Sequence, residues 1–391
     1  MTEKTKSVQI LSPEHCRQKY AHIKDGITYL NHASVSPLSD DVKSAITGFL
    51  EQRNRTKIEN LEEGVEILEN CRTRISHLIH TPKTENIAFT RNTSDGISLV
   101  AEGLPLKEGD EILLNSMEFP SNVHPWRSIE KRKNLKIRYA EPVHGTLPVE
   151  LIKKNITHQT RVISVSAVQF LSGYKSDLAE IGRLCREKEL FFVVDGIQGL
   201  GVTDIDVEGM NIDALATGGH KWLMSPLGIG FLYLNERILE NFTPVRTGWF
   251  SVEEPWDLLN YDQPWLNGAL RLEDGTPNML GIAGMNASLE NLLHIGIGNI
   301  SARVQKLTGF LVDLIQNDSR FNLYTSSDSK MRAGIVTFST KAEVDGDKLI
   351  GELKNEKISI SHRQGFLRIA PHYYNTHEEL QHVFEEICSR L

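Results

Sequence analysis

Short apolar runs alternate along the first two thirds of the chain with longer stretches that have the spacing of amphipathic helices. The apolar runs cover residues 87–89, 111–114, 162–165, 191–194 and 229–233. Such short runs predict buried strands, whereas residues 40–80 and 178–188 predict helices. Strands that alternate with helices are typical of βαβ units and a mainly parallel sheet, which binds ligands beyond the carboxyl ends of its strands.

The pattern changes after about residue 285. A long helix carries Val304, Leu307 and Leu311 on one face, and strands follow at 334–338, 358–360 and 366–369. Thr376 and Glu379 predict a capping box at the start of a terminal helix. We therefore expect a large domain over residues 36–285, a smaller α+β domain over 286–391, and a segment of residues 1–35 that packs with the small domain.

Composition narrows the class of protein without identifying it. A chain of 391 residues is long enough for two domains. The formal net charge of -8 argues against nucleic acid or an anionic membrane surface as the main partner. No apolar run approaches the roughly 20 residues that span a bilayer, and the polar N-terminus, residues 1–10, lacks the apolar stretch of a signal peptide.

The cysteines point to a reducing compartment. Cys16, Cys71, Cys185 and Cys388 lie far apart and form no CxxC pair. This spacing favours reduced thiols over a disulfide framework, and no metal site is indicated. We expect a cytoplasmic protein.

Three groups of polar residues stand where strands are predicted to end. Asp195 follows the buried strand 191–194, Lys221 follows a glycine pair, and Thr93 and Ser94 occupy a strand-to-helix turn. Alone, each has an ordinary explanation: a turn aspartate, a solvated loop lysine and a helix N-cap. Together they supply an amine, a carboxylate and an anion site at a helix N-terminus, which are the groups that pyridoxal 5′-phosphate (PLP) chemistry requires.

Residues 194–198 (VDGIQ) and 219–222 (GHKW) resemble the class V aminotransferase family, which includes cysteine desulfurases, kynureninase and isopenicillin N epimerase-like proteins. The resemblance extends from Tyr29 to His377. It implies the α/β fold of fold-type-I PLP-dependent transferases: a mainly parallel seven-stranded sheet with helices on both faces, plus a smaller α+β C-terminal domain.

The resemblance also implies roles for individual residues. Lys221 is expected to form the Schiff base with PLP, and Asp195 to pair with the pyridinium nitrogen. Arg368 is expected to bind the substrate carboxylate, with a structural salt bridge as the alternative. Five other residues are expected to hold the cofactor: Thr93, Ser94 and His220 at the phosphate, Gln198 at the phenolic oxygen and Phe119 on the ring. Thr276 is expected to reach the partner subunit's phosphate, which implies a homodimer.

Substrate recognition is less well defined by the sequence. Asn31 and His32, together with the segment 248–250 and His372, are candidates for contacts with the substrate side chain. Arg363 is another candidate because it lies near Arg368 in the sequence, and a surface position is the alternative.

Two departures from the family pattern narrow the reaction. The segment 361–367 contains no cysteine, which argues against persulfide-forming cysteine desulfuration, and Cys388 is expected to be a packing residue in the terminal helix. Gly218 stands where the desulfurases place a phosphate-binding serine, and Thr217 or the glycine amides are candidates to replace it. We expect a PLP-dependent aminotransferase acting on an amino acid, with a β-eliminating C–S or C–C lyase or an epimerase as the alternative.

Two other classes of protein fit less well. A non-catalytic protein on the same fold would not need both Lys221 and Asp195. A dinucleotide-dependent oxidoreductase would need a GxGxxG turn after the first strand, and none is present.

Overall fold

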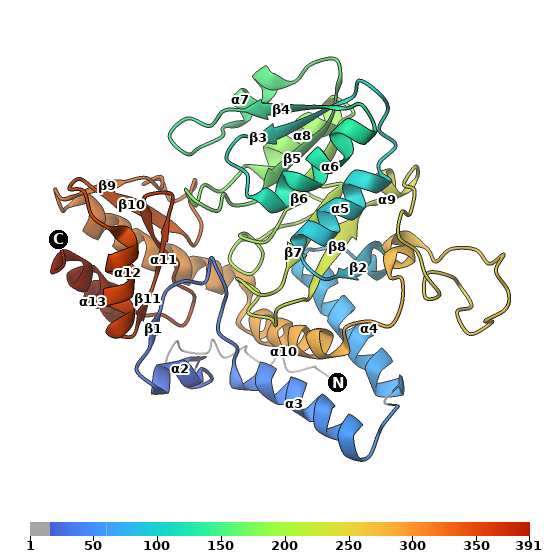
Figure 1. Cartoon of the computed structure of the whole chain (residues 1–391), viewed down its shortest axis with the longest axis horizontal. Helices are drawn as coiled ribbons and strands as arrows, with labels where there is room; N and C mark the ends of the chain where they lie inside the picture. Colours follow the sequence, from blue (N-terminus) through green and yellow to red (C-terminus); the bar gives the residue numbers. More distant parts are fainter. Residues whose placement is uncertain (1–15, 60) are drawn as a thin grey trace, which may run out of the picture.

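The computed structural model describes residues 16–59 and 61–391, so the polar segment 1–10 considered above lies outside the described residues. A seven-stranded sheet forms the centre of the molecule (Figure 1). Its strands, in spatial order, are β2 (Ile87–Thr90), β8 (Gly230–Leu234), β7 (Ala214–Gly218), β6 (Phe191–Asp195), β5 (Thr160–Ser166), β3 (Glu111–Asn115) and β4 (Lys136–Ala140). Only β8 runs antiparallel to its neighbours, which confirms the mainly parallel sheet.

Both faces of this sheet are covered, as predicted. Residues at alternate positions of the strands belong to two separate apolar clusters: Ile163 and Phe192 face one side, and Val162 and Val193 face the other. The first cluster contains residues of α4 (Leu61–Leu78), α8 (Leu178–Glu187) and α10 (Met279–Ile295). The second contains residues of α5 (Thr93–Gly103) and α6 (His124–Arg132). Burial on both faces explains why the strands are continuous apolar runs without alternation.

The helical stretch predicted over residues 40–80 is two helices. It consists of α3 (Asp40–Arg55) and α4, and both pack against α10. Ser39 accepts a hydrogen bond from the backbone N–H of Val42 and so caps the start of α3.

The C-terminal part is a four-stranded antiparallel sheet with helices. The strand order is β12 (Ser361–Arg363), β13 (Phe366–Ile369), β10 (Val336–Thr340) and β9 (Phe321–Leu323). Helices α11 (Ile297–Gln316), α12 (Gly346–Asn355) and α13 (His377–Cys388) share a third apolar cluster with it. The capping box of Thr376 and Glu379 is present at the start of α13.

The N-terminal segment joins this second sheet region. Strand β1 (Thr28–Tyr29) pairs in parallel with β11 (Ile358–Ser359), and Asn31 forms an isolated bridge with Ala370. Helix α10 continues through residue 285 to Ile295, where Gly296, with φ of 86°, separates it from α11. The exact domain limits remain a prediction.

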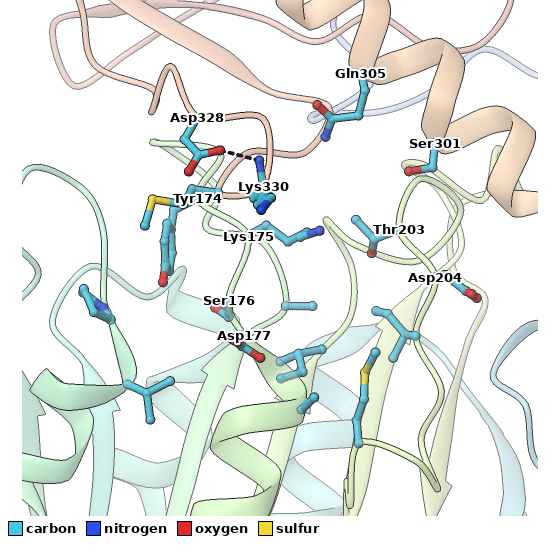
Figure 2. Close-up of a pocket in the computed structure, with 18 residues that line it drawn as sticks. Tyr174, Lys175, Ser176, Asp177, Thr203, Asp204, Ser301, Gln305, Asp328 and Lys330 are labelled. Carbon is cyan, nitrogen blue, oxygen red and sulfur yellow. Dashed lines mark hydrogen bonds between the residues drawn. The ribbon is translucent and has the colours of Figure 1, made fainter.

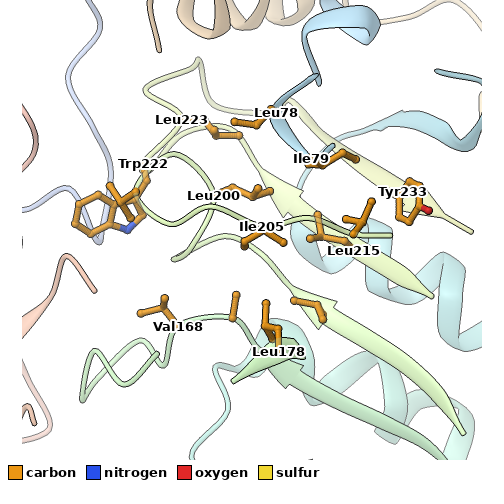
Figure 3. Close-up of a cluster of buried hydrophobic side chains, with 14 of the residues drawn as sticks. Leu78, Ile79, Val168, Leu178, Leu200, Ile205, Leu215, Trp222, Leu223 and Tyr233 are labelled. Atoms are coloured by element: carbon orange, nitrogen blue, oxygen red, sulfur yellow. The ribbon is translucent and has the colours of Figure 1, made fainter. Parts of the chain in front are cut away.

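Apolar residues hold the loop between β7 and β8 in place (Figure 3). Trp222 and Leu223 of this loop belong to the same cluster as Leu200 and Leu215, which lie on and after the central strands. A Cβ atom at Gly334 would lie 2.3 Å from the Trp222 ring, so glycine is required there for the indole to pack against the second sheet region. The loop is therefore anchored on both sides.

No helix in residues 16–59 or 61–391 is long and apolar enough to cross a membrane.

Candidate active site

The predicted site residues gather at the carboxyl edge of the central sheet. Asp195 ends β6, and the loop that carries Lys221 follows β7, the adjacent strand. Helix α5 starts just after β2, a strand that runs parallel to β7. The helix packs closely on β7: a Cβ atom at Gly96 would lie 2.8 Å from Ala216 Cβ. Thr93, at the first position of α5, therefore lies at the same edge as Asp195 and Lys221.

Lys221 is a buried amine with an altered pKa. Its residue is 8% exposed, and burial lowers the pKa to about 8, against the opposing effect of the Asp195 carboxylate. The ammonium nitrogen lies 5.3 Å from the centre of the Phe119 ring. No carboxylate of the described residues lies within 4 Å of it, so its charge is compensated only at longer range. A lowered pKa gives this lysine a substantial fraction of neutral, nucleophilic amine near neutral pH.

Asp195 presents one free carboxylate oxygen. Oδ1 accepts a hydrogen bond of 3.0 Å from the backbone N–H of Ile197, whereas Oδ2 is buried and has no hydrogen-bond partner among the described residues. Burial raises the pKa of this carboxyl to about 6. A buried acceptor without a donor is costly unless a ligand supplies one. A protonated pyridine nitrogen is such a donor.

A second buried carboxyl, which the sequence did not single out, lies behind Asp195. Glu118 accepts hydrogen bonds from the backbone N–H and the hydroxyl of Ser166, and Ser166 is the residue paired with Asp195 in the ladder of β5 and β6. Asn122 also donates to Glu118, at 3.1 Å. Burial raises the pKa of Glu118 to about 7, and the Asp195 charge adds to this rise. The sequence signal that could have identified Glu118 is its position directly before Phe119 and after a buried strand.

The start of α5 has the features of an anion site. Asn92, rather than Thr93 or Ser94, caps the helix by accepting from the backbone N–H of Asp95. The Thr93 hydroxyl is therefore not used as a cap: it is buried, and none of the described residues forms a hydrogen bond with it. Ser94 is exposed and lines a surface cavity together with Ser98 and Arg246. Thr93 and the first backbone N–H groups of α5 can bind a phosphate here.

The glycine that replaces the family's serine leaves room for histidine. A Cβ atom at Gly218 would lie 3.2 Å from His220 Nδ1, closer than ordinary contact. Burial lowers the pKa of His220 to about 4, so the imidazole is neutral. The Thr217 hydroxyl donates to the Gly218 carbonyl, at 3.2 Å, and is already used within the protein. The glycine amides and His220 are the remaining candidates on this side of the phosphate.

Phe119 and Gln198 are the two residues predicted to contact the cofactor at its ring and its phenolic oxygen. The Phe119 ring is 39% exposed and meets Phe170 edge-on, with ring centres 5.2 Å apart. Gln198 donates to the Ala33 carbonyl and accepts from the Trp222 indole N–H, at 3.0 Å and 2.7 Å. Both bonds fix the Gln198 amide, so its second N–H is the group that remains for a phenolic oxygen.

Arg368 is a buried guanidinium, and no carboxylate in the part of the chain that the structure describes pairs with it. It is 3% exposed and donates only to uncharged oxygens: the Ser34 hydroxyl, the Phe170 carbonyl and the Ser361 hydroxyl. Burial, followed by the nearby Arg363 charge, lowers its pKa to about 10. These neutral contacts orient the guanidinium without neutralising it, so a substrate carboxylate is a fitting counter-ion.

The residues expected to contact the substrate differ in whether their side chains are free to do so. Asn31 accepts from the Ser34 hydroxyl at 2.8 Å and so lies behind Arg368. His32 is fully buried, and its two ring nitrogens lie 2.8 Å from the Ala370 carbonyl and 2.7 Å from the Tyr374 hydroxyl. His32 therefore has no ring nitrogen left to bind a substrate. Arg363, in contrast, is exposed, and it lies close enough to Lys221 for its charge to lower the pKa of that amine.

Thr276 lies apart from the Lys221 amine. It is exposed and lines a cavity of about 320 Å³ together with Arg91, Gly228 and Arg246. Its predicted contact with a partner subunit stays a prediction.

A larger cavity, of about 660 Å³, lies between the two sheet regions (Figure 2). Lys175 and Lys330 extend into it beside Asp177, Asp204 and Asp328. Neither Lys221 nor Asp195 lines it, so it is separate from the candidate site.

The residues present fit PLP. The free Asp195 oxygen, the unpartnered Thr93 hydroxyl, the Lys221 amine and the exposed Phe119 ring suit its nitrogen, phosphate, aldehyde and ring face respectively. Of the groups involved, Phe170 and Ser361 were missed in the sequence, because a backbone carbonyl and a common hydroxyl carry no motif.

Comparisons with known proteins agree with this chemistry. The family described as Aminotransferase class-V matches residues 28–383. An uncharacterized aminotransferase of Bacillus subtilis, YcbU, is 27% identical over 97% of this chain and 98% of its own length. A probable cysteine desulfurase of Halalkalibacterium halodurans is 31% identical over 80% of this chain and 77% of its own.

Solved structures confirm the predicted fold type. The apo cysteine desulfurase of Thermococcus onnurineus NA1 superposes with a TM-score of 0.89 at 26% identity, over 98% of this chain and 100% of that chain. A mutant of C-DES, with glycine covalently linked to its PLP cofactor, superposes with a TM-score of 0.87 over 95% of this chain and 98% of that one. At 23% identity, the second likeness shows the fold alone.

Proposed function

This chain belongs to the class-V aminotransferase family of PLP-dependent enzymes, as predicted, and from that premise we propose that it is an aminotransferase acting on an amino acid. The observation that carries the proposal is two groups whose charges act on Lys221: Asp195, which has a free oxygen, and the Arg368 guanidinium, which has no counter-ion among the described residues. They suit a cofactor nitrogen and a substrate carboxylate. The whole-length likeness to an uncharacterized aminotransferase supports the reaction type.

When bound, PLP supplies an electron sink that makes the α-proton of an amino acid acidic. The protein's residues prepare that step. Asp195 keeps the ring nitrogen protonated, Arg368 orients the α-carboxylate, and Lys221 carries the α-proton as general base and acid. A pKa of about 8 suits both directions of this proton transfer near neutral pH.

The second candidate is a β-eliminating lyase, favoured by the likeness to proteins named cysteine desulfurases. Persulfide-forming desulfuration of the usual kind is not proposed, because residues 361–367 contain no cysteine. Cys388 packs at the end of α13, where burial raises the pKa of its thiol.

Single-turnover chemistry separates these reactions. Holoenzyme mixed with an amino-acid panel, without an acceptor keto acid, should form one keto acid per active site and stop. Continued release of ammonia or sulfide would replace the aminotransferase assignment with elimination, and continued loss of chirality would replace it with epimerisation. A Lys221→Ala variant should lose the absorbance band of the cofactor that is covalently attached to the protein, measured without added amino acid, and all turnover. If that variant keeps both, the assignment of Lys221 is wrong.

We also propose that the enzyme is a cytoplasmic homodimer. An exposed apolar loop supports association: Trp256, Leu259 and Tyr261 are 63%, 82% and 85% exposed. Exposed apolar groups of this size usually mark an interface, and the loop leads directly to Thr276. Cys71, Cys185 and Cys388 form no disulfide, which supports a reducing compartment.

A mixing experiment tests the shared site. Lys221→Ala and Thr276→Asp should each be inactive, the second because its carboxylate repels the phosphate. If Thr276 completes the partner's site, co-expression of both variants should create hybrid dimers with one intact site each, about a quarter of all sites. A monomer, or a Thr276 that serves its own subunit, would give no recovery.

A further inference from the structure

We propose that Arg363 makes this site selective for amino acids whose side chain ends in a second anionic group. The inference rests on the proposed function in one respect, because it takes Arg368 as the partner of the α-carboxylate. It adds a residue and a substrate class that the family assignment does not give.

The hairpin of β12 and β13 places Arg363 beside Arg368. Ser361 pairs with Arg368, and Arg363 pairs with Phe366, in an antiparallel ladder. Directly opposed residues in such a ladder lie on the same face of the sheet, as do residues two apart. Arg363 and Arg368 therefore share one face, as diagonal neighbours whose Cβ atoms lie somewhat less than about 7–8 Å apart.

That face is the one turned toward the candidate site. Arg368 reaches across it to the Ser34 hydroxyl and the Phe170 carbonyl, at 2.9 Å and 2.8 Å. The hairpin turn is short: Gln364 and Gly365 have φ of 51° and 81°, the left-handed conformation of a two-residue turn. Such a turn keeps the ladder in register up to Arg363, its last paired residue.

Neither arginine is neutralised by the protein. No carboxylate of residues 16–59 or 61–391 lies within 4 Å of the Arg363 or Arg368 guanidinium. Arg368 is buried, whereas Arg363 is exposed at the rim. Two guanidinium groups, one deep and one outer, offer separate partners for two anionic groups of a single substrate.

Both arginine charges act on the pKa of the reacting amine. The Arg368 and Arg363 charges each lower the pKa of Lys221, and Arg363 also lowers the pKa of Arg368. The two arginines therefore raise each other's free energy until an anion arrives. A substrate with two anionic groups relieves this repulsion more than a substrate with one.

Aromatic side chains limit the space beside Arg363. Phe366 lies opposite it in the ladder, and the Tyr324 ring packs on Phe366 with centres 4.6 Å apart. Phe119 lies against the Lys221 amine and contacts the Phe170 ring edge-on, so both rings also lie at the site. Apolar walls exclude water and strengthen an ion pair formed between them. They suit the methylene groups of a short acidic side chain.

Matched amino-acid pairs test this selectivity in the holoenzyme. Glutamate against glutamine and aspartate against asparagine differ only in side-chain charge, and cysteine sulfinate and phosphoserine test other anionic groups. We expect kcat/KM to favour the acidic member of each pair. An Arg363→Gln variant should lose roughly 10- to 100-fold in kcat/KM for acidic substrates and little for their amides, as expected for a hydrogen bond to a charged group.

Binding without turnover provides an independent measurement. Calorimetric titration of holoenzyme with glutarate and with butyrate should show tighter binding of the dicarboxylate, and Arg363→Gln should abolish that difference. Arg363→Lys should restore part of it. Arg53→Gln removes the same charge from an exposed position on α3. It should change neither the kcat/KM ratio of acid to amide nor the affinity ratio of glutarate to butyrate.

The outcomes distinguish this inference from the proposed function. If wild type and Arg363→Gln treat acids and amides alike while cofactor absorbance and Lys221-dependent turnover persist, the role of Arg363 is wrong and the proposed function stands. If absorbance and turnover are absent from the wild type, the proposed function itself fails. A preference for acids that survives in Arg363→Gln would also overturn the role of Arg363.

Discussion

At the scale of single residues, burial determines the chemistry of the site. Lys221, Asp195 and Arg368 are almost fully buried, and burial is the largest cause of the altered pKa of each. Each departs from its usual pKa toward the uncharged form, as desolvation requires. Perturbed groups of this kind concentrate at functional sites. Here they are three groups with complementary roles around one cofactor.

The pKa of Lys221 predicts how cofactor uptake depends on pH. Only the neutral amine attacks an aldehyde, so the rate of PLP uptake by cofactor-free enzyme should rise about tenfold per pH unit below about 8 and then level off. Stopped-flow absorbance measures this rate. A midpoint near 10.5 would mean that burial does not lower the pKa. Arg363→Gln should move the midpoint upward, because it removes a charge that lowers the pKa.

The contacts of Arg368 predict an effect on substrate binding. Ser34→Ala removes the 2.9 Å bond to the guanidinium and the link to Asn31. We expect KM to rise roughly tenfold, the cost of one hydrogen bond to a charged group, with kcat nearly unchanged. Ser128→Ala, at an exposed position on α6, is the control. A fall in kcat at constant KM would contradict an orienting role.

At the scale of elements, the strand ends and the hairpin turn position the chemistry. The β12–β13 hairpin carries both arginines, and its turn needs a residue at φ of 81° at Gly365. A Cβ atom there would meet no other atom within 4 Å, so the backbone conformation alone makes glycine preferable. Gly351, inside α12, is also free of contacts but has an ordinary helical conformation.

These two glycines form a matched pair for stability measurements. Gly351→Ala should raise the free energy of unfolding by about 0.5–1 kcal/mol, because alanine is the better helix former. Gly365→Ala should lower it by about 1–2 kcal/mol, because a left-handed conformation strains a residue with a Cβ atom. Urea unfolding at fixed PLP concentration measures both. Equal effects of the two substitutions on the free energy of unfolding would show that the left-handed conformation at Gly365 does not determine the effect of alanine there.

At the scale of the whole molecule, buried acids and histidines should limit the pH range of stability. Glu118 has a folded pKa of about 7, raised mainly by burial, against 4.5 as the ordinary value. Between these values the folded state binds more protons than the unfolded state, so rising pH favours unfolding. His372 has a folded pKa lowered to about 4, so its contribution is full above 6.5 and is lost as pH falls toward 4.

Thermal unfolding of cofactor-free enzyme tests the alkaline side. The unfolding temperature of the wild type should fall, relative to Glu118→Gln, as pH rises from 5 to 8. The free-energy change behind this difference is at most on the order of 3 kcal/mol, at about 1.4 kcal/mol per pKa unit. Parallel curves for the two proteins would exclude Glu118 as the titrating group.

The sequence by itself determined the class of fold and the central residues of the site. Strands that are buried on both faces are apolar throughout, so the sequence pattern identified them. Asp195 stands at the end of one such strand, and Lys221 follows the end of another. The edge strand β4 was missed, because its residues are half exposed and lack an apolar run. The capping box of α13 was predicted because its hydrogen bonds are local.

Only the tertiary structure decided what each polar group still has free to bind a ligand. Both ring nitrogens of His32 form hydrogen bonds, with Ala370 and Tyr374. Asn92 caps α5, which leaves the Thr93 hydroxyl without a partner among the described residues. Glu118 lies behind Asp195, and Arg363 shares a face with Arg368. These facts depend on contacts between residues far apart in the sequence. Local pattern reveals which residue types are available, whereas the packing of distant segments determines which of their hydrogen bonds and charges remain unsatisfied.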